Sequence, residues 1–182
     1  MIKDSGERRS FESGAVRDIA EGKGRCDLLP LTVISHMYSD KQAKIFRYID
    51  RYINTGSTDN LLEAIWLFID IAFKGNQETA LLEVSKQYEE GCKKYGDRNW
   101  EKGIPVHCYI DSGVRHYLKV LRGDMDEPHN RAFIWNMLGA IWTHTNKPEL
   151  IDLPFMENKS QFELGIHVHS SVAPVNHGES ET

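Results

Sequence analysis

Carboxylate, imidazole and cationic side chains are concentrated between Tyr88 and Thr143, on segments whose apolar periodicity predicts partly buried helices. Burying an ionised side chain costs free energy unless the charge is paired, hydrogen-bonded or bound to a metal. Hard divalent cations such as Mg²⁺ and Mn²⁺ prefer oxygen ligands, and Mn²⁺ also accepts imidazole. We therefore interpret this region as a site for a charged ligand, such as a polyphosphate bound through a metal ion.

The first candidate residues are Glu89 and Glu90, in a segment expected to be helical over 77–95. With about 3.6 residues per turn, Glu89 lies about 100° from the apolar stripe through Leu81 and Tyr88, and Glu90 about twice as far. We therefore expect Glu89 to border the core and Glu90 to face outward. The alternative is that both are solvated surface carboxylates.

A second group lies in the segment expected to be helical over 109–122. Ser112, Gly113 and His116 share one face of this helix, so that two small residues leave space beside an imidazole. This arrangement favours a pocket into which His116 points.

A basic stripe runs along a neighbouring face of the same helix, through Arg115, Lys119 and Arg122. Like charges this close repel one another unless anions neutralise them, and a guanidinium binds phosphate through two parallel hydrogen bonds. The stripe therefore indicates phosphate binding. The alternative is a solvated stripe that pairs with the acidic residues after it, which are Asp124, Asp126 and Glu127.

The last long helix, expected from Pro128 to about Thr145, places His129 and Asn136 in a stripe of small and apolar residues. Polar groups in such a groove indicate a cavity. Asp126 also suits the N-cap of this helix, which is its alternative role. Six residues are better explained as one site than as separate caps and core polar groups: Glu89, His116, Asp126, Glu127, His129 and Asn136.

Residues 1–27 are polar and rich in glycine, and we expect them to form an extended arm. Arg17, Lys23 and Arg25 alternate with glycines that allow backbone amides to approach an anion. The arm lacks the P-loop pattern G-x-x-x-x-G-K-[ST]. The alternative is a charged disordered arm.

Apolar residues recur at helical spacing through most of the remaining chain. We expect an all-α bundle of about six helices, with one domain over 28–150, the N-terminal arm, and an irregular tail over 151–182. The segment 61–73 is apolar nearly all round, which predicts a deep position. The predicted helices span 28–38, 41–53, 61–73, 77–95, 109–122 and 128–145.

The 182 residues carry a net charge of −5, which argues against duplex nucleic acid as the main partner. No apolar run approaches the roughly 20 residues that cross a bilayer, and the first residues lack the apolar core of a secretory signal. The three cysteines include no C-x-x-C pair, so we expect no disulfide framework and no structural zinc site. A cytoplasmic protein without membrane or nucleic-acid partners is expected.

A family resemblance rests on four motifs that occur in order: GAVRDIAEGKGRCDLLP, YEEGCKKYGDRNWEKGIP, SGVRHYLK and DEPHNRAFIWN. Together they resemble the phage-associated dATP/dGTP diphosphohydrolase family, which is similar to the MazG-like all-α nucleotide pyrophosphohydrolases. The resemblance spans roughly residues 11–30 and 80–150 and leaves 31–79 as an added helical insert. It implies hydrolysis of dATP or dGTP to the monophosphate and pyrophosphate, in the host cytoplasm for a phage-encoded protein.

MazG-like enzymes bind their metals through an E-x-x-E helix and an E-x-x-D helix. In this sequence no second spaced glutamate follows Glu89 and Glu90, and His129 and Asn136 stand where acidic residues would be expected. The alternative function is therefore a protein that binds or sequesters a nucleotide without catalysis.

These observations lead to hypothetical roles for the candidate residues. The predicted ligands of Mg²⁺ or Mn²⁺ are Glu89, Asp126, Glu127 and His129. The predicted catalytic residues are Glu89, Glu90 and His116, the last two as alternative bases for the attacking water. The predicted substrate-binding residues are Arg17, Lys23, Arg25, Asn99, Trp100, Arg115, Lys119 and Asn136. Helical bundles often complete their sites across symmetric interfaces, so we also expect a homodimer or homotetramer.

Overall fold

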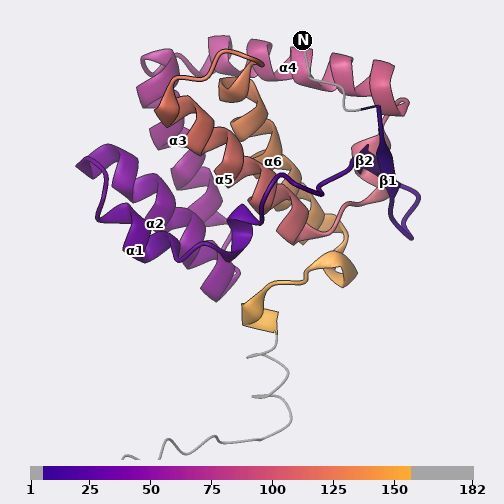
Figure 1. Cartoon of the computed structure of the whole chain (residues 1–182), viewed down its shortest axis with the longest axis horizontal. Helices are drawn as coiled ribbons and strands as arrows, with labels where there is room; N and C mark the ends of the chain where they lie inside the picture. Colours follow the sequence, from indigo (N-terminus) through magenta and orange to yellow (C-terminus); the bar gives the residue numbers. More distant parts are fainter. Residues whose placement is uncertain (1–5, 157–182) are drawn as a thin grey trace, which may run out of the picture.

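The computed structural model describes residues 6–156 (Figure 1). Helices dominate this part of the chain, and its only sheet has two short strands. The prediction of an all-α bundle is therefore confirmed. The α-helices are α1 (Leu31–Ser35), α2 (Asp40–Thr55), α3 (Asp59–Phe73), α4 (Gln77–Tyr95), α5 (Val106–Arg122) and α6 (His129–Asn146).

Local signals set most helix boundaries near their predicted positions. Helix α4 has the predicted extent, because the side chain of Asn76 caps its first turn by accepting a hydrogen bond from Thr79 N at 2.7 Å. The first predicted helix, over 28–38, is wrong in extent, because α1 begins only after Pro30. A proline has no N–H to donate and restricts the residue before it to extended backbone. Residues Cys26–Leu28 instead form the 3-10 helix η1.

Helices α5 and α6 pack against each other in the middle of the molecule, and α2 and α3 lie beside them (Figure 1). One ring from each of these four helices meets in the core: Phe46, Phe68, Tyr117 and Phe133 have neighbouring ring centroids 4.4 to 5.9 Å apart. Each ring is nearly or fully buried, and burial of one such side chain contributes roughly 1.5–3 kcal/mol. This cluster fixes the relative positions of α5 and α6, which carry much of the polar site.

Two expectations about helix faces are wrong. Helix α3 is not buried all round, because Trp66 is 51% exposed and Ile71 is 37% exposed. Leu81, which was assigned to the inward stripe of α4, is 55% exposed, whereas Ala80 and Val84 are buried. The rest of the predicted stripe does lie inward, because Val84 is buried and Tyr88 lines the cavity described below. At the start of the stripe the small Ala80, and not the larger Leu81, takes the inward position.

The N-terminal arm folds onto its own domain as a two-stranded antiparallel sheet of β1 (Arg8–Ser10) and β2 (Val16–Asp18). Asp18 ties the sheet to the end of α4 by accepting hydrogen bonds from Lys94 Nζ at 2.6 Å and from Tyr95 Oη at 2.8 Å. The sheet therefore lies beside the C-terminal end of α4 (Figure 1). This contact makes the arm one wall of the cavity described below.

After α6 the chain forms the 3-10 helix η3 (Pro148–Leu150) and returns to the bundle. Leu153 and Phe155 are buried there, and Asp152 accepts a hydrogen bond from the backbone N–H of His107 at 2.9 Å. The first residues of the predicted irregular tail thus pack on the domain, and residues 157–182 lie outside the described part. Among the described helices, none is long and apolar enough to cross a membrane.

Candidate functional site

A cavity of about 510 Å³ lies between β2, α4, the 3-10 helix η2 (Asn99–Lys102), α5 and the start of α6. Its volume falls in the range of small-molecule sites. Cationic, aromatic and acidic side chains line it. The cationic ones are Arg9, Arg17, Lys23, Arg115 and Lys119, the aromatic ones are Tyr88, Tyr95, Trp100 and Trp135, and the acidic ones are Asp18, Asp111 and Glu127. The cavity therefore offers positive charge for an anion and ring faces for a planar group.

The guanidinium of Arg17 is held in this cavity by neutral groups alone. It donates to Cys108 O at 3.2 Å, to Ser112 Oγ at 3.2 Å and to Asn136 Oδ1 at 3.0 Å. It also lies over the rings of Tyr109 and Trp135. Burial lowers the pKa of Arg17, and among residues 6–156 no carboxylate forms an ion pair with it. A buried cation without a counter-charge is costly, so the cavity favours an anionic ligand.

The other cations of the predicted phosphate site are partly neutralised by the protein itself. Arg115 pairs with Asp111 and donates to the carbonyl oxygens of Lys23 and Gly24, so it also holds the arm. Lys119 Nζ lies 3.4 Å from Asp126 Oδ2 and 3.5 Å from Glu127 Oε1.

Arg122 points away from the cavity. It is exposed and pairs with Asp124. Lys119 and Arg122 therefore pair with the acidic residues that follow them, which is the alternative to phosphate binding given above for this stripe.

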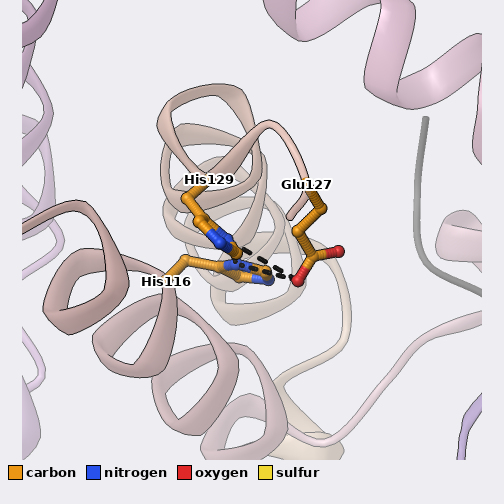
Figure 2. A group of neighbouring side chains, drawn as sticks. All are labelled: His116, Glu127 and His129. Carbon is orange, nitrogen blue, oxygen red and sulfur yellow. Dashed lines mark hydrogen bonds and ion pairs between the residues drawn. The ribbon is translucent and has the colours of Figure 1, made fainter. Parts of the chain in front are cut away.

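Two histidines and a glutamate form a compact cluster at the cavity wall (Figure 2). His116 Nδ1 lies 3.0 Å from His129 Nδ1, and Glu127 Oε1 lies 3.8 Å and 3.6 Å from these two nitrogens. We call this set the His–Glu cluster. Helix α5 supplies His116, and the chain entering α6 supplies Glu127 and His129 (Figure 2).

The hydrogen bond that His129 makes to Asp126 leaves one lone pair facing the centre of the His–Glu cluster. His129 Nε2 lies 2.8 Å from Asp126 Oδ1, so this nitrogen carries the proton and Nδ1 is left as an acceptor. Burial, with His129 and Arg115 nearby, lowers the pKa of His116 to about 3, so this ring is neutral at pH 7. Neutral imidazole is the form that binds metals.

The spacing of the His–Glu cluster fits a metal ion. Two nitrogens that each lie about 2.1 Å from one ion, at a right angle, are about 3.0 Å apart, which is the observed separation. The alternative is a hydrogen bond between the two rings, which one proton would satisfy. A second group, Asp124, Asp126 and His129, could also hold an ion. Because Asp126 already binds Nε2 of His129, it is better placed to orient that ring than to compete for a metal.

Comparison with known proteins finds one similarity that includes this site. Residues 70–153 match the family model described as dATP/dGTP diphosphohydrolase, N-terminal. This part of the chain is therefore similar to that family. No curated protein and no solved structure matches the chain. The family is named for a hydrolase activity, and the match includes α4, α5, α6 and the His–Glu cluster, whereas Arg17 and Lys23 lie outside it.

The structure separates Glu89 from the rest of the predicted metal site. Glu89 is 63% exposed and pairs with Lys93 one turn along α4. The predicted orientation of this helix is wrong, because Glu90 is the more buried of the two and pairs with Arg131 of α6 at 2.7 Å. Both carboxylates therefore have partners away from the His–Glu cluster.

Three predicted substrate residues have other partners. The side-chain amide of Asn99 accepts from Val16 N and donates to Val16 O, each at 2.9 Å, so it fixes the arm. Arg25 forms two hydrogen bonds to Asp27 and lines a separate, smaller cavity. Asn136 donates to Ala132 O and accepts from Arg17, so it positions the guanidinium.

Trp100 keeps its predicted place in the cavity. Its ring meets Tyr88 edge-on, with centroids 5.5 Å apart, and both rings line the cavity together with Trp135 and Gly91. Tyr88, Trp135 and Gly91 were not predicted from the sequence as site residues, because the prediction relied on polar residues. Gly91 could have indicated the cavity from the sequence, because a glycine inside a helix lowers stability and is expected only where a side chain would interfere with packing or binding.

Proposed function

We propose that this protein hydrolyses a purine deoxynucleoside triphosphate, dATP or dGTP, to the monophosphate and pyrophosphate in the 510 Å³ cavity. The observation that carries the proposal is Arg17, a cation enclosed by neutral groups in the same cavity that His116 and Glu127 line. The family match supplies the substrate class. MazG-like ancestry remains a prediction.

In this proposal the cationic and the aromatic side chains of the cavity bind different parts of the substrate. Arg17 and Lys23 of the arm face the phosphates, and Lys119 exchanges its contacts with Asp126 and Glu127 for a phosphate oxygen when the substrate is bound. Trp100 and Tyr88 offer aromatic surface to the purine. The arm thereby contributes part of the substrate site in the same chain.

The His–Glu cluster would hold the divalent metal, with Asp126 fixing the tautomer of His129. A bound divalent ion polarises a phosphoryl oxygen and lowers the pKa of a coordinated water. Because two of the three donors are imidazoles, this set favours Mn²⁺ over Mg²⁺. Glu89 and Glu90, with their partners elsewhere, have no role in this proposal.

The test is an assay of purified protein with each of the four dNTPs and Mn²⁺ or Mg²⁺, with nucleotide and phosphate products separated by chromatography. We expect the purine monophosphates and pyrophosphate, and loss of turnover in Glu127→Gln with Mn²⁺ binding weakened by calorimetry. Glu89→Gln is the matched control and should keep both. Tight dGTP binding without turnover would favour the alternative, a nucleotide-sequestering protein, and release of inorganic triphosphate would refute the proposed bond cleavage.

We also propose that the protein is a homodimer or homotetramer, because bundles of this kind often assemble symmetrically. Light scattering of the active protein tests this. A strict monomer with full activity would contradict it.

A further inference from the structure

A thiol, an imidazole and a carboxylate are connected in series at the start of α5. Cys108 Sγ lies 3.2 Å from His107 Nε2, and the other ring nitrogen of His107 is hydrogen-bonded to Asp152 Oδ2. Asp152 is held in turn by the backbone N–H of His107 at 2.9 Å. This is the order in which a nucleophile, an imidazole and an orienting carboxylate are arranged when a thiol is activated.

The thiol borders a second cavity of about 360 Å³, whose charged lining residues are Arg9, Arg25, Glu21, Asp111 and His107. Arg25 is paired with Asp27, and Asp111 is paired with Arg115. Cys108 is only 1% exposed, so a reagent reaches the sulfur through this cavity and not from open solvent. Arg9 Nε is buried without a hydrogen-bond partner, so it remains as a donor for a small molecule that carries negative charge.

A positively charged ring lies next to the sulfur. The hydrogen bond to Asp152, then that to Cys108, raises the pKa of His107 to about 10, so the ring next to the thiol is positively charged at pH 7. Cys108 also lies in the first turn of α5, where the helix dipole favours negative charge. Of the other two cysteines, burial raises the pKa of Cys26, and Cys92 contacts Asp97 at 3.5 Å.

We propose that Cys108 is a thiol–disulfide exchange site for a small anionic disulfide. Cys108 gives up its proton to the solvent, its sulfur attacks one sulfur of the disulfide RS–SR beside the positively charged His107 ring, and the S–S bond breaks. The products are a mixed disulfide between Cys108 and R, and RS⁻, which takes up the proton as RSH. Cys108 is oxidised, and the released half of the disulfide is reduced.

Acyl transfer is a less suitable chemistry for this thiol. A tetrahedral oxyanion needs free backbone N–H donors near the nucleophile. The N–H of Cys108 donates to Pro105 O, and that of His107 donates to Asp152. Both nearby donors are occupied, so disulfide exchange, which forms no oxyanion, is favoured.

Cys108 connects the exchange site to the larger cavity. The carbonyl oxygen of Cys108 accepts a hydrogen bond from Arg17 at 3.2 Å. A bulky group on Cys108 would shift this turn of α5 and weaken anion binding by Arg17, a consequence that rests on the proposed function. The labelling reaction itself involves no nucleotide, so the two ideas can fail separately.

The experiment incubates the full chain with oxidised glutathione at pH 7 and follows each cysteine by peptide mass spectrometry. We expect Cys108 to form the mixed disulfide faster than Cys26 or Cys92. His107→Gln should slow it by about a hundredfold, the lower end of what a positioned acid–base group contributes. Asp152→Asn should slow it as well. The labelling rate of Cys92 and the thermal transition report whether each variant remains folded.

Three results would overturn the proposal. The first is a folded wild-type protein in which Cys108 stays unmodified while Cys92 reacts. The second is His107→Gln protein that reacts at the wild-type rate. The third is faster reaction in Asp152→Asn, which would mean that the C-terminal segment shields the thiol and does not activate it. For the effect on Arg17, dGTP affinity is compared before and after labelling, with Cys108→Ser as the unlabelled control.

Discussion

Gly91 offers a test in which stability and binding should change in opposite directions. It lies inside α4 and lines the large cavity, and a Cβ built there would meet no atom within 4 Å. The other glycines inside helices have packing reasons: a Cβ on Gly113 would collide with Met137, and one on Gly139 with Tyr109. Gly91 has no such reason within the protein, so we infer that its missing side chain leaves room for the ligand.

The magnitudes follow from this geometry. A glycine inside a helix costs about 0.5–1 kcal/mol relative to alanine, so Gly91→Ala should raise the free energy of unfolding by this amount. For a chain of this size the midpoint of thermal unfolding should rise by roughly 1–4 °C. A methyl group pressed against a fitted ligand costs about 1–3 kcal/mol, which weakens dGTP binding by a factor of about 5 to 160.

The assay combines thermal unfolding with calorimetric titration of dGTP, carried out in the Glu127→Gln background to prevent turnover. Ser85→Ala is the matched control, because Ser85 is exposed on α4 and does not line the cavity. It should alter helix stability slightly and leave binding unchanged. If Gly91→Ala raises stability but binds dGTP as tightly as the parent, Gly91 is not a ligand contact and the reasoning fails.

Three further predictions concern charged groups. Arg17→Met should weaken triphosphate binding by about 1.5–3 kcal/mol, the worth of a hydrogen bond to a charged group, measured by titration; unchanged affinity would remove Arg17 from the anion site. Glu90→Gln should lower the thermal midpoint, because it leaves the nearly buried Arg131 without its ion pair, while kcat stays within a few-fold; a large loss of kcat at unchanged stability would return Glu90 to the mechanism. The pKa of His107 is raised from 6.5 to about 10 by Asp152, so its contribution to stability is full below pH 6.5 and is lost as the pH rises through 10. Denaturant unfolding at pH 6 and pH 10 should show this loss in wild type and a smaller one in Asp152→Asn; equal losses would contradict the linkage.

Much of the candidate site could be predicted from the sequence, because the sequence signals for it are local. Periodicity and caps predicted α4, α5 and α6 to within a few residues. Two of the predicted metal ligands, Glu127 and His129, are neighbours in the chain, and His116 lies one helix earlier, so any packing of α5 on α6 brings them near each other. Arg17 and Lys23 stood out because cations alternate with glycines in the arm.

The rotation of α4 could not be read from its own residues. Its inward side includes the small residues Ala80 and Gly91, which carry little hydrophobic signal. The larger Leu81 therefore turned the predicted stripe away from them, although Val84 and Tyr88 of that stripe do lie inward. The error exchanged the environments of Glu89 and Glu90. Which face of an amphipathic helix is buried depends on the shape of the surface it meets, and that surface is formed by other segments.

The sequence by itself determined the helical class, most helix ends and the types of residue available for anion and metal binding, since these depend on contacts within one or two turns. Only the tertiary structure decided which charges are left without a partner. It paired Lys119, Arg122 and Glu90 with neighbouring side chains, left Arg17 among neutral groups, and brought Asp152 to His107 and Cys108 from another segment. The physical reason is that the free energy of a charge depends on distances of a few ångströms to groups far away in the chain.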